Sequence, residues 1–402
     1  MIKFLLALIL FLPTTCIMGS YVYVLFVPIG LFFYKNELMN AITDFYENPF
    51  RKEYLLSFWI IVLLLIGIGV NSLIGSNFIH LTKRGTLLLI PLTILSAYII
   101  SDQKVYRFLL IFIVVEVCVG ILEYVIGVNT FFSSLPKHHV FNNYVSLYKT
   151  RVFGLSANST YLAQKCLIGI LLLYFVDLNL KTRHVIGLFL FLMTGVILTF
   201  GRTVVVSVLV CFGFYFLTYL YNHFRDLKHL KINMNKSLLI SSILFSLVIL
   251  STFSFWSNQF NRMGLRPHEN KNTQGAKVLE ASGIGKVEMA GRRELWGKAI
   301  DFIFENPVYG NHSQRFLVNN KHVHNSLLEY LSTHGLILLI VILAFIIFNL
   351  NGFNIAFCGG IMLYSLGQFG IFWDISFLDI LFMSILLFST RVTNSNRYEK
   401  DI

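Results

Sequence analysis

The sequence has little charge for its length. Only 13% of its 402 residues are Asp, Glu, Lys or Arg and 56% are hydrophobic, whereas a soluble domain carries about 25% charged residues. This deficit excludes an ordinary soluble protein and indicates an integral membrane protein. The net charge of +12 is spread over the loops. It favours contact with anionic lipid or an anionic substrate, and not with nucleic acid.

The sequence also lacks the motifs of metal and nucleotide sites. Its loops hold no D-x-D carboxylate cluster and no His/Cys metal spacing, and the chain has no P-loop. We therefore expect no metal and no cofactor. The cysteines have no paired spacing and all lie in apolar stretches, where we expect core or lipid-facing residues. They are Cys16, Cys118, Cys166, Cys211 and Cys358.

Apolar stretches long enough to cross a bilayer fill most of the chain. The candidate spans are residues 3–19, 21–35, 55–74, 85–101, 107–127, 158–178, 184–201, 203–222, 237–256, 326–349, 353–371 and 374–391. The first is interpreted as a retained helix and not as a cleaved signal peptide. An even number of spans puts both termini on one side, and the short loops of that side carry more Lys and Arg, so both termini are predicted to be cytoplasmic. The predicted fold class is an all-α integral membrane protein with about twelve transmembrane helices.

Three regions follow from this topology. Residues 1–256 hold the first nine spans and an outer loop at 128–157. Residues 257–325 form one large periplasmic loop with short amphipathic helices, and residues 326–402 hold the last three spans and a short cytoplasmic tail. Long loops cross the membrane regardless of their charge, so the basic residues of 257–325 do not oppose this orientation.

The large loop contains a predicted amphipathic helix over 293–305, which Asn306-Pro307 should end. Arg292 and Arg293 lie at its N-terminus, where the positive end of the helix dipole disfavours a cation by a few tenths of a kcal/mol. A bound anion would reverse that penalty. The alternative is two solvated arginines without a ligand.

The sequence HVHN lies just before the tenth span. Ser326 and Glu329 form an S-x-x-E pattern, which predicts a capping box at the start of a helix. His324 and Asn325 would then precede the helix at the outer membrane surface. The helix dipole disfavours protonated histidine, so His324 is predicted to be neutral and available as a base, with His322 orienting it or the substrate. The alternative is a pair of interfacial histidines without a chemical role.

Further cations are predicted at the same outer face. Arg202 lies in a tight turn between the seventh and eighth spans, where a charge is usually retained for a partner, although it could also reach lipid phosphates. Arg151 precedes the sixth span. Glu123 is expected to pair with one of these cations, and Asp374 is another candidate partner, whereas the deeper Glu116 has no assigned role.

Several arginines and a neutral histidine at one membrane face suit a particular chemistry. Without a metal, an arginine cluster suits a phosphate or diphosphate, and a nearby histidine suits the removal of a proton from a hydroxyl. Glycosyl transfer from a lipid diphosphate sugar combines the two. A transporter or flippase is the alternative from another class; it would place charges along a central path and often show inverted repeats, and neither is evident.

The segments GRRELW…ENPVYG and HVHNSLLEYLSTHG resemble the O-antigen ligase and O-antigen polymerase family. That resemblance implies twelve spans, cytoplasmic termini and a large periplasmic loop between the ninth and tenth spans. The pattern departs from the family at Asn311 and Leu338, where glycine is common. The residues that match family motifs are Arg151, Gly154, Arg202, Arg292, Trp296, His324 and Asn325.

The resemblance implies a metal-independent, inverting glycosyltransferase of the bacterial inner membrane whose active site faces the periplasm. The donor would be an undecaprenyl-diphosphate glycan. His324, Arg292 and Arg202 would be catalytic, whereas the substrate-binding set would be His322, Asn325, Arg151, Arg293, Trp296, Lys83 and Arg84. The acceptor would be a second lipid-linked glycan in an O-antigen polymerase, with a chain-length regulator among its partners, or the lipid A core in a ligase. The run from Arg151 to Asn158 and the short tail favour the polymerase slightly.

Overall fold

The computed structural model describes most of the helical part of the chain. The described residues are 1–15, 20–37, 39–40, 43, 52–75, 86–128, 130–132, 151–176, 178, 180–199, 201, 203–213, 292–318, 322–351, 354–368, 370–372 and 376–394. They form helices and connecting segments, and no strand occurs among them apart from an isolated bridge between Thr15 and Ser156. The predicted all-helical class is therefore confirmed for this part of the chain.

The helices follow the apolar stretches of the sequence. They are α1 (Ile2–Phe11), η1 (Leu12–Thr14), η2 (Ser20–Leu25), α2 (Phe26–Phe33), α4 (Lys52–Ile74), α6 (Thr86–Ile100), α7 (Gln103–Ile126), α10 (Ser159–Phe175), α11 (Thr182–Thr199), a helix over Thr203–Gly213, α16 (Arg292–Glu305), α17 (Ser326–Asn349), α18 (Ile355–Gly367) and α19 (Phe377–Asn394). A helix occurs in each predicted span except 237–256, which lies outside the described residues.

Four of these helices are long and apolar enough to cross a membrane: Ser57–Ile74 of α4, α7, α11 and α17. The others are shorter, so the full set of twelve crossings stays a prediction. The outward faces of the long helices are apolar. On α7, Ile111, Val115 and Leu122 share one exposed face, which has the spacing and chemistry of a surface covered by lipid.

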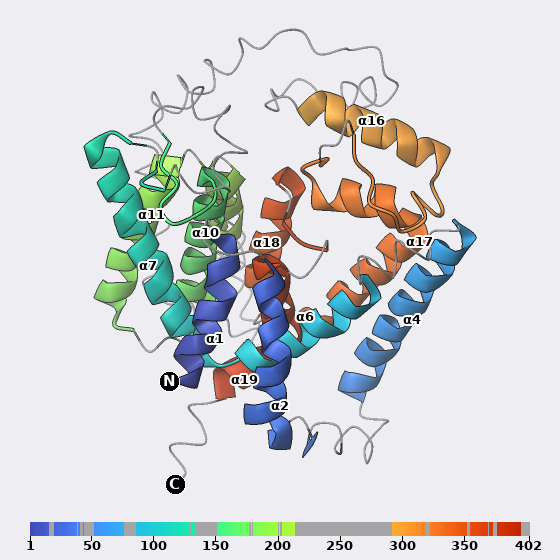
Figure 1. Ribbon diagram of the computed structural model, residues 1–402, viewed down its shortest axis with the longest axis horizontal. Helices are drawn as coiled ribbons and strands as arrows, with labels where there is room; N and C mark the ends of the chain where they lie inside the picture. Colours follow the sequence, from blue (N-terminus) through green and yellow to red (C-terminus); the bar gives the residue numbers. More distant parts are fainter. Residues whose placement is uncertain are drawn as a thin grey trace, which may run out of the picture.

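The bundle packs in two groups (Figure 1). α1 packs against α7, and α10 packs against α11 and α7, whereas α4 packs along α17 and α6 along α19. α18 lies between the groups, where it contacts α10, α17 and α19. Two helices end in the usual way, because Asn158 caps the start of α10 and left-handed Gly127 ends α7.

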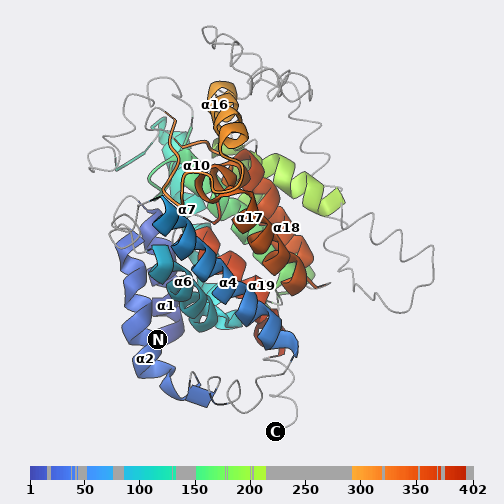
Figure 2. The ribbon, with the colours of Figure 1, turned by 90° about the vertical axis from the view of Figure 1, so that its right-hand side faces the viewer.

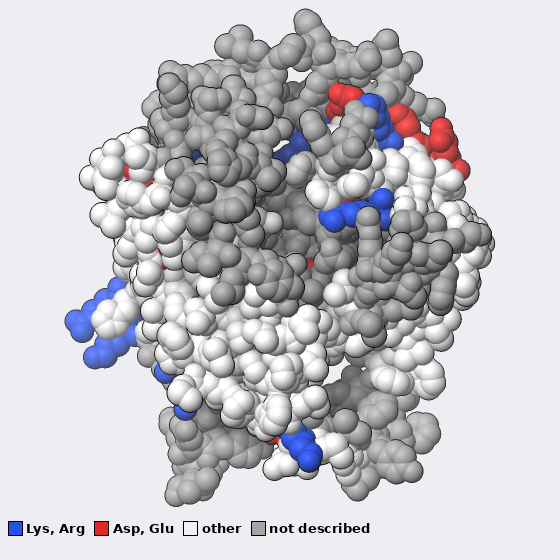
Figure 3. Space-filling view, in the orientation of Figure 1, with Lys and Arg blue, Asp and Glu red and all other residues white. Residues whose placement is uncertain are grey.

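α16 lies across one end of the bundle. It packs on α17 and is the uppermost described helix in both ribbon views, while the N-terminus lies in the lower half of each (Figures 1 and 2). The described surface between these ends is mostly uncharged, with Lys and Arg at the upper right and along the left and lower edges (Figure 3). A mostly uncharged surface of this kind suits a membrane protein. The predicted region boundaries are not tested, because 257–291 lies outside the described residues.

Candidate active site

The HVHN segment leads directly into α17, as predicted, but the cap differs from the prediction. The N-cap is Asn325, whose side chain accepts a hydrogen bond from the Leu328 N–H at 3.1 Å. Ser326 is already inside the helix, and its Oγ accepts hydrogen bonds from the N–H groups of Gly370 and Ile371. The predicted capping box is therefore wrong, and Ser326 instead joins the start of α17 to the segment that follows α18.

Glu329 contacts His322 and Arg315, and it does not cap the start of α17. Its carboxylate is fully buried in the first turn of α17, where Oε1 lies 2.9 Å from Nδ1 of His322 and 3.5 Å from Nε of Arg315. A carboxylate only accepts hydrogen bonds, so Nδ1 of His322 carries the proton and Nε2 faces away from Glu329. Glu329 therefore fixes the ring orientation and the tautomer of His322.

His324 has an unusual backbone. Its φ is +59°, in the left-handed region that a residue with a side chain adopts only when its surroundings enforce it. Burial, together with the positive charge of Arg292 and the nearby His322, lowers the pKa of His324 to about 4. The predicted neutral state is supported, although the largest cause is burial and not the helix dipole. At neutral pH the imidazole is an uncharged base.

α16 begins at Arg292 and ends at Glu305, so the predicted amphipathic helix and its end are confirmed. Nη1 of Arg292 donates to the carbonyl oxygen of Gly367 at the end of α18. Trp296, one turn along α16, donates from Nε1 to the carbonyl oxygen of Val323 at 2.8 Å. Trp296 thus holds the residue between the two histidines, and α16 joins α18 to the HVHN segment.

The turn between α11 and the next helix lies beside this junction. A Cβ built on Gly367 would lie 2.7 Å from Cγ2 of Thr203, so Thr203 packs directly against the backbone that binds Arg292. Arg202, predicted to be catalytic, lies outside the described residues, although its neighbours Gly201 and Thr203 are described. Arg202 therefore stays a prediction.

The segment that begins with Arg151 is held by α7. Glu123 accepts hydrogen bonds from the N–H groups of Phe153 and Gly154 at 3.0 and 2.7 Å, so its predicted pairing with a cation is replaced by backbone contacts. Gly154 adopts φ +58°, and a Cβ there would lie 2.9 Å from the carbonyl oxygen of Glu116, so only glycine fits. Arg151 is half-buried at the start of this segment.

The role of Glu116 is also visible. It is fully buried and forms an ion pair with Lys165 of α10 at 2.7 Å, and both groups contact Ser156 Oγ, at 2.5 and 3.0 Å. A buried ion pair persists only where each charge has close partners. Glu116 and Glu123, seven residues apart on α7, therefore fasten residues 153–156 to the bundle.

The remaining predicted residues are not placed. Lys83, Arg84 and Asp374 lie outside the described residues, as does the side chain of Arg293. The structure thus brings together Arg292, Trp296, His322, His324 and Asn325, at the start of α17 and the end of α18. Within the described residues, no group of three or more His, Cys, Asp or Glu side chains is suited to a metal ion.

The sequence analysis missed three features of this arrangement. They are Arg315 as a partner of Glu329, the Gly367 carbonyl as a partner of Arg292, and the contact of Glu329 with His322. The first two have no local signal, because each is brought to the site by packing. Glu329 did have one, since a glutamate in the first turn of a helix that follows two histidines has two candidate partners besides the helix N-terminus.

The chain is similar to one known protein family. Residues 186–343 match the model of a family described as O-antigen ligase. The match includes most of α11, the 203–213 helix, α16 and most of α17. It therefore includes Arg292, Trp296, His322, His324 and Asn325. Arg151 and α18 lie outside it. Neither a search of curated proteins nor one of solved structures found a match.

Proposed function

We propose that this chain transfers a glycan from undecaprenyl diphosphate to an acceptor hydroxyl at the periplasmic face of the bacterial inner membrane. The match of residues 186–343 to a family described as O-antigen ligase supports this proposal. The family and the apolar helices make it a membrane protein and a glycosyltransferase-like enzyme. We assign it as a polymerase of O-antigen or a related surface polysaccharide. One observation carries the proposal: α16 joins its first residue, Arg292, to the residue beside His324, because Trp296 of the same helix donates to the Val323 carbonyl.

The two residues take complementary parts in the reaction. The acceptor oxygen attacks the anomeric carbon with inversion while the bond from that carbon to the diphosphate oxygen breaks. The hydroxyl proton passes to His324, and the bonding electrons leave with the lipid diphosphate. Arg292, with Arg202 as the second predicted cation, stabilises the charge on the leaving group. Removal of one such donor costs about 10² to 10³ in rate.

The surrounding residues support these roles. Trp296 fixes Val323 between the two histidines, and Glu329 orients His322. Asn325 caps α17 by accepting from the Leu328 N–H, and the positive end of the helix dipole favours an anion at this helix start. Arg151, Arg293, Lys83 and Arg84 are assigned to the anionic part of the donor on the sequence pattern alone.

The ligase is the second candidate, because the matching family is described as O-antigen ligase. It would use the same donor and the lipid A core as its acceptor. The surface polysaccharide of a deletion strain, separated on a gel, distinguishes the two. Loss of a polymerase leaves single repeats on the core. Loss of a ligase leaves a bare core and accumulated lipid-linked polymer, and an unchanged ladder contradicts both assignments.

A further inference from the structure

The loop that follows α16 is bonded to both α4 and α17. Residues 306–313 lie beside the break in α17, since the Leu336 N–H donates to the carbonyl oxygen of Pro307 at 2.9 Å. Asn71, near the end of α4, donates from Nδ2 to the carbonyl oxygen of Tyr309 at 2.9 Å. Figure 1 shows the end of α16, α17 and α4 together on its right-hand side. The 306–313 loop is therefore fixed to two helices that are long and apolar enough to cross a membrane.

The polar groups at this junction face inward. Asn71 is 4% exposed, and His334, whose Nδ1 lies 3.0 Å from Ser313 Oγ, is 6% exposed. Ser332 and Thr333 of α17 are also buried, and their carbonyl oxygens accept from backbone N–H groups of the loop. Several backbone groups of the loop thus bind other parts of the protein. Non-helical backbone at membrane depth is tolerated only when its polar groups are satisfied in this way.

The apolar side chains of the junction face outward. Val308 is 42% exposed and Tyr309 is 46% exposed. Leu336, which is bonded to the loop, and Ile337 are exposed beside them on α17. Polar groups inside and apolar side chains outside are the reverse of the usual arrangement in water. The exposed surface of the loop therefore continues the apolar outer face of α17, which suits contact with acyl chains.

The length of α17 places the loop at the level of the hydrocarbon layer. From Leu336 to Phe348 its sequence is wholly apolar, and Asn349 ends this run. A helix of that length extends for about 20 Å, whereas the hydrocarbon core is about 30 Å thick. About 10 Å of the core thus lies at the break and on its α16 side. α4 agrees with this level, because exposed Leu73 lies past Asn71, which contacts the loop.

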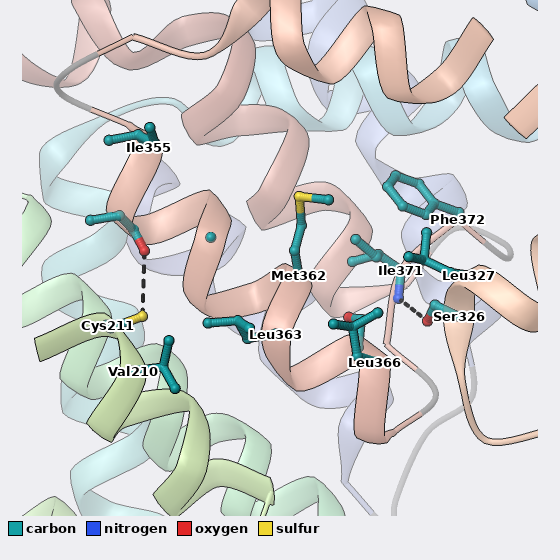
Figure 4. A pocket seen from close by; sticks show the side chains of 13 residues that line it. Val210, Cys211, Ser326, Leu327, Ile355, Met362, Leu363, Leu366, Ile371 and Phe372 are labelled. Atoms are coloured by element: carbon teal, nitrogen blue, oxygen red, sulfur yellow. Dashed lines mark hydrogen bonds between the residues drawn. The ribbon is translucent and has the colours of Figure 1, made fainter. Parts of the chain in front are cut away.

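The apolar cavity near the start of α17 is a separate feature. Its volume is about 360 Å³, and it lies between α18, the 203–213 helix and the first residues of α17. Side chains such as Leu327, Met362 and Leu363 surround it (Figure 4). Val308 and Tyr309 are not among its lining residues. They lie on the outer surface, so the cavity does not account for their exposure.

We propose that Val308 and Tyr309 insert between the acyl chains of the leaflet on the α16 side, so that the 306–313 loop is embedded in the membrane. The tyrosine suits this depth, because its hydroxyl can reach the headgroups while its ring contacts hydrocarbon. Glu305, exposed at the end of α16, limits the depth, because a carboxylate is costly in hydrocarbon. The end of α16 is thereby held at the membrane surface. The inference requires that α4 and α17 cross a membrane, and it does not depend on glycan transfer.

The test adds a tryptophan to the full-length protein in phosphatidylcholine vesicles. The acyl chains of the lipid carry bromine in one set of vesicles and none in the other, since bromine quenches tryptophan on contact. Val308→Trp and Tyr309→Trp report on the loop. Ile337→Trp, on the exposed face of α17, is the lipid-facing reference, and Lys298→Trp, on the polar face of α16, is the water-facing control. The emission of the unaltered protein is subtracted from that of each variant.

We expect bromine to remove as much of the added emission in Val308→Trp and Tyr309→Trp as in Ile337→Trp, and iodide on both sides of the membrane to leave it unchanged. Lys298→Trp should respond to iodide and not to bromine. Tyr309→Trp is a conservative change, so it serves alone if Val308→Trp is not produced.

The inference is overturned if iodide quenches the loop reporters as it quenches Lys298→Trp. It is equally overturned if neither agent quenches them, which would mean that protein covers the loop. Failure of the proposed function would leave all of these readings unchanged, because it appears only as the absence of glycan transfer.

Discussion

At the scale of single residues, His324 combines a left-handed backbone with a half-buried imidazole beside a guanidinium. Both features carry a cost. A non-glycine residue in a sparsely populated backbone region costs of order 1–3 kcal/mol, and such strain collects at functional sites. Here the cap at Asn325 and the bond from Trp296 to Val323 hold the chain on both sides of the strained residue.

The lowered pKa of His324 predicts the pH dependence of transfer. His324 accepts the proton only when it is neutral, so activity is lost as the pH falls through its pKa in the free enzyme, which burial, Arg292 and His322 lower to about 4. The acidic limb of kcat/KM should therefore lie near pH 4, well below the ordinary histidine pKa of ~6.5. A limb near that ordinary value would mean that another histidine, or a more exposed His324, acts as the base.

Arg292→Lys should lose most of the activity although it keeps the charge. A lysine ammonium cannot offer the planar fork that contacts a carbonyl and a diphosphate together, and Arg292 already contacts Gly367. We expect kcat to fall about a hundredfold with normal protein levels. Lys298→Arg, on the exposed polar face of α16 in a pair with Glu294, is the control and should be fully active. Wild-type rates in Arg292→Lys would show that the site needs only a positive charge.

At the scale of elements, α17 is broken at Gly335 (Figure 1), which has φ +81° and ψ 176°. The segment after α16 fills the break. Asn311 and Ser313 donate backbone hydrogen bonds to the carbonyls of Ser332 and Thr333, and Leu336 donates to Pro307. The helix that carries Glu329 is thereby joined to the loop that leads from α16 to Arg315.

Gly335→Ala should destabilise the protein. This backbone conformation is almost exclusive to glycine, and a Cβ there would press into the carbonyl of Val308. We expect thermal unfolding in detergent, followed by fluorescence size-exclusion, to shift down by at least a few degrees, for a strain of about 1–3 kcal/mol. Gly187→Ala, where the added Cβ meets no atom within 4 Å, should unfold at the wild-type temperature or slightly above. Equal melting of the two variants would mean that the break in α17 is not held by close packing.

The sequence alone predicted the helices that depend on local patterns, and it missed features that depend on distant contacts. Periodicity predicted α16, and its end at Asn306-Pro307, because both are local properties of the chain. The S-x-x-E pattern wrongly predicted Ser326 as the N-cap of α17. Asn325 is an equally good N-cap, and both Ser326 and Glu329 bind residues far from them in the chain. The break at Gly335 depends on contacts with residues 307–313, earlier in the chain, and a hydropathy pattern does not indicate such contacts.

At the scale of the whole molecule, the site forms where segments far apart in sequence meet at one end of the bundle. The start of α16, the end of α18, the 322–326 segment and Thr203 are joined by the contacts of Arg292, Trp296, Ser326 and Gly367. Hydropathy predicted that these segments share a membrane face, because that follows from counting spans. Hydropathy could not predict which helices contact one another. Those contacts depend on side-chain packing between helices that are all apolar, so hydropathy does not distinguish one partner from another.

The most direct test of the account is glycan transfer by the purified protein from an undecaprenyl-diphosphate donor to a lipid-linked acceptor, measured for His324→Ala beside His184→Ala. His184 is an exposed histidine at the start of α11, outside the contacts of the site. We expect His324→Ala to lose nearly all transfer while still binding donor, and His184→Ala to match the wild type. Full transfer by His324→Ala would remove the proton acceptor from the mechanism and contradict the central claim.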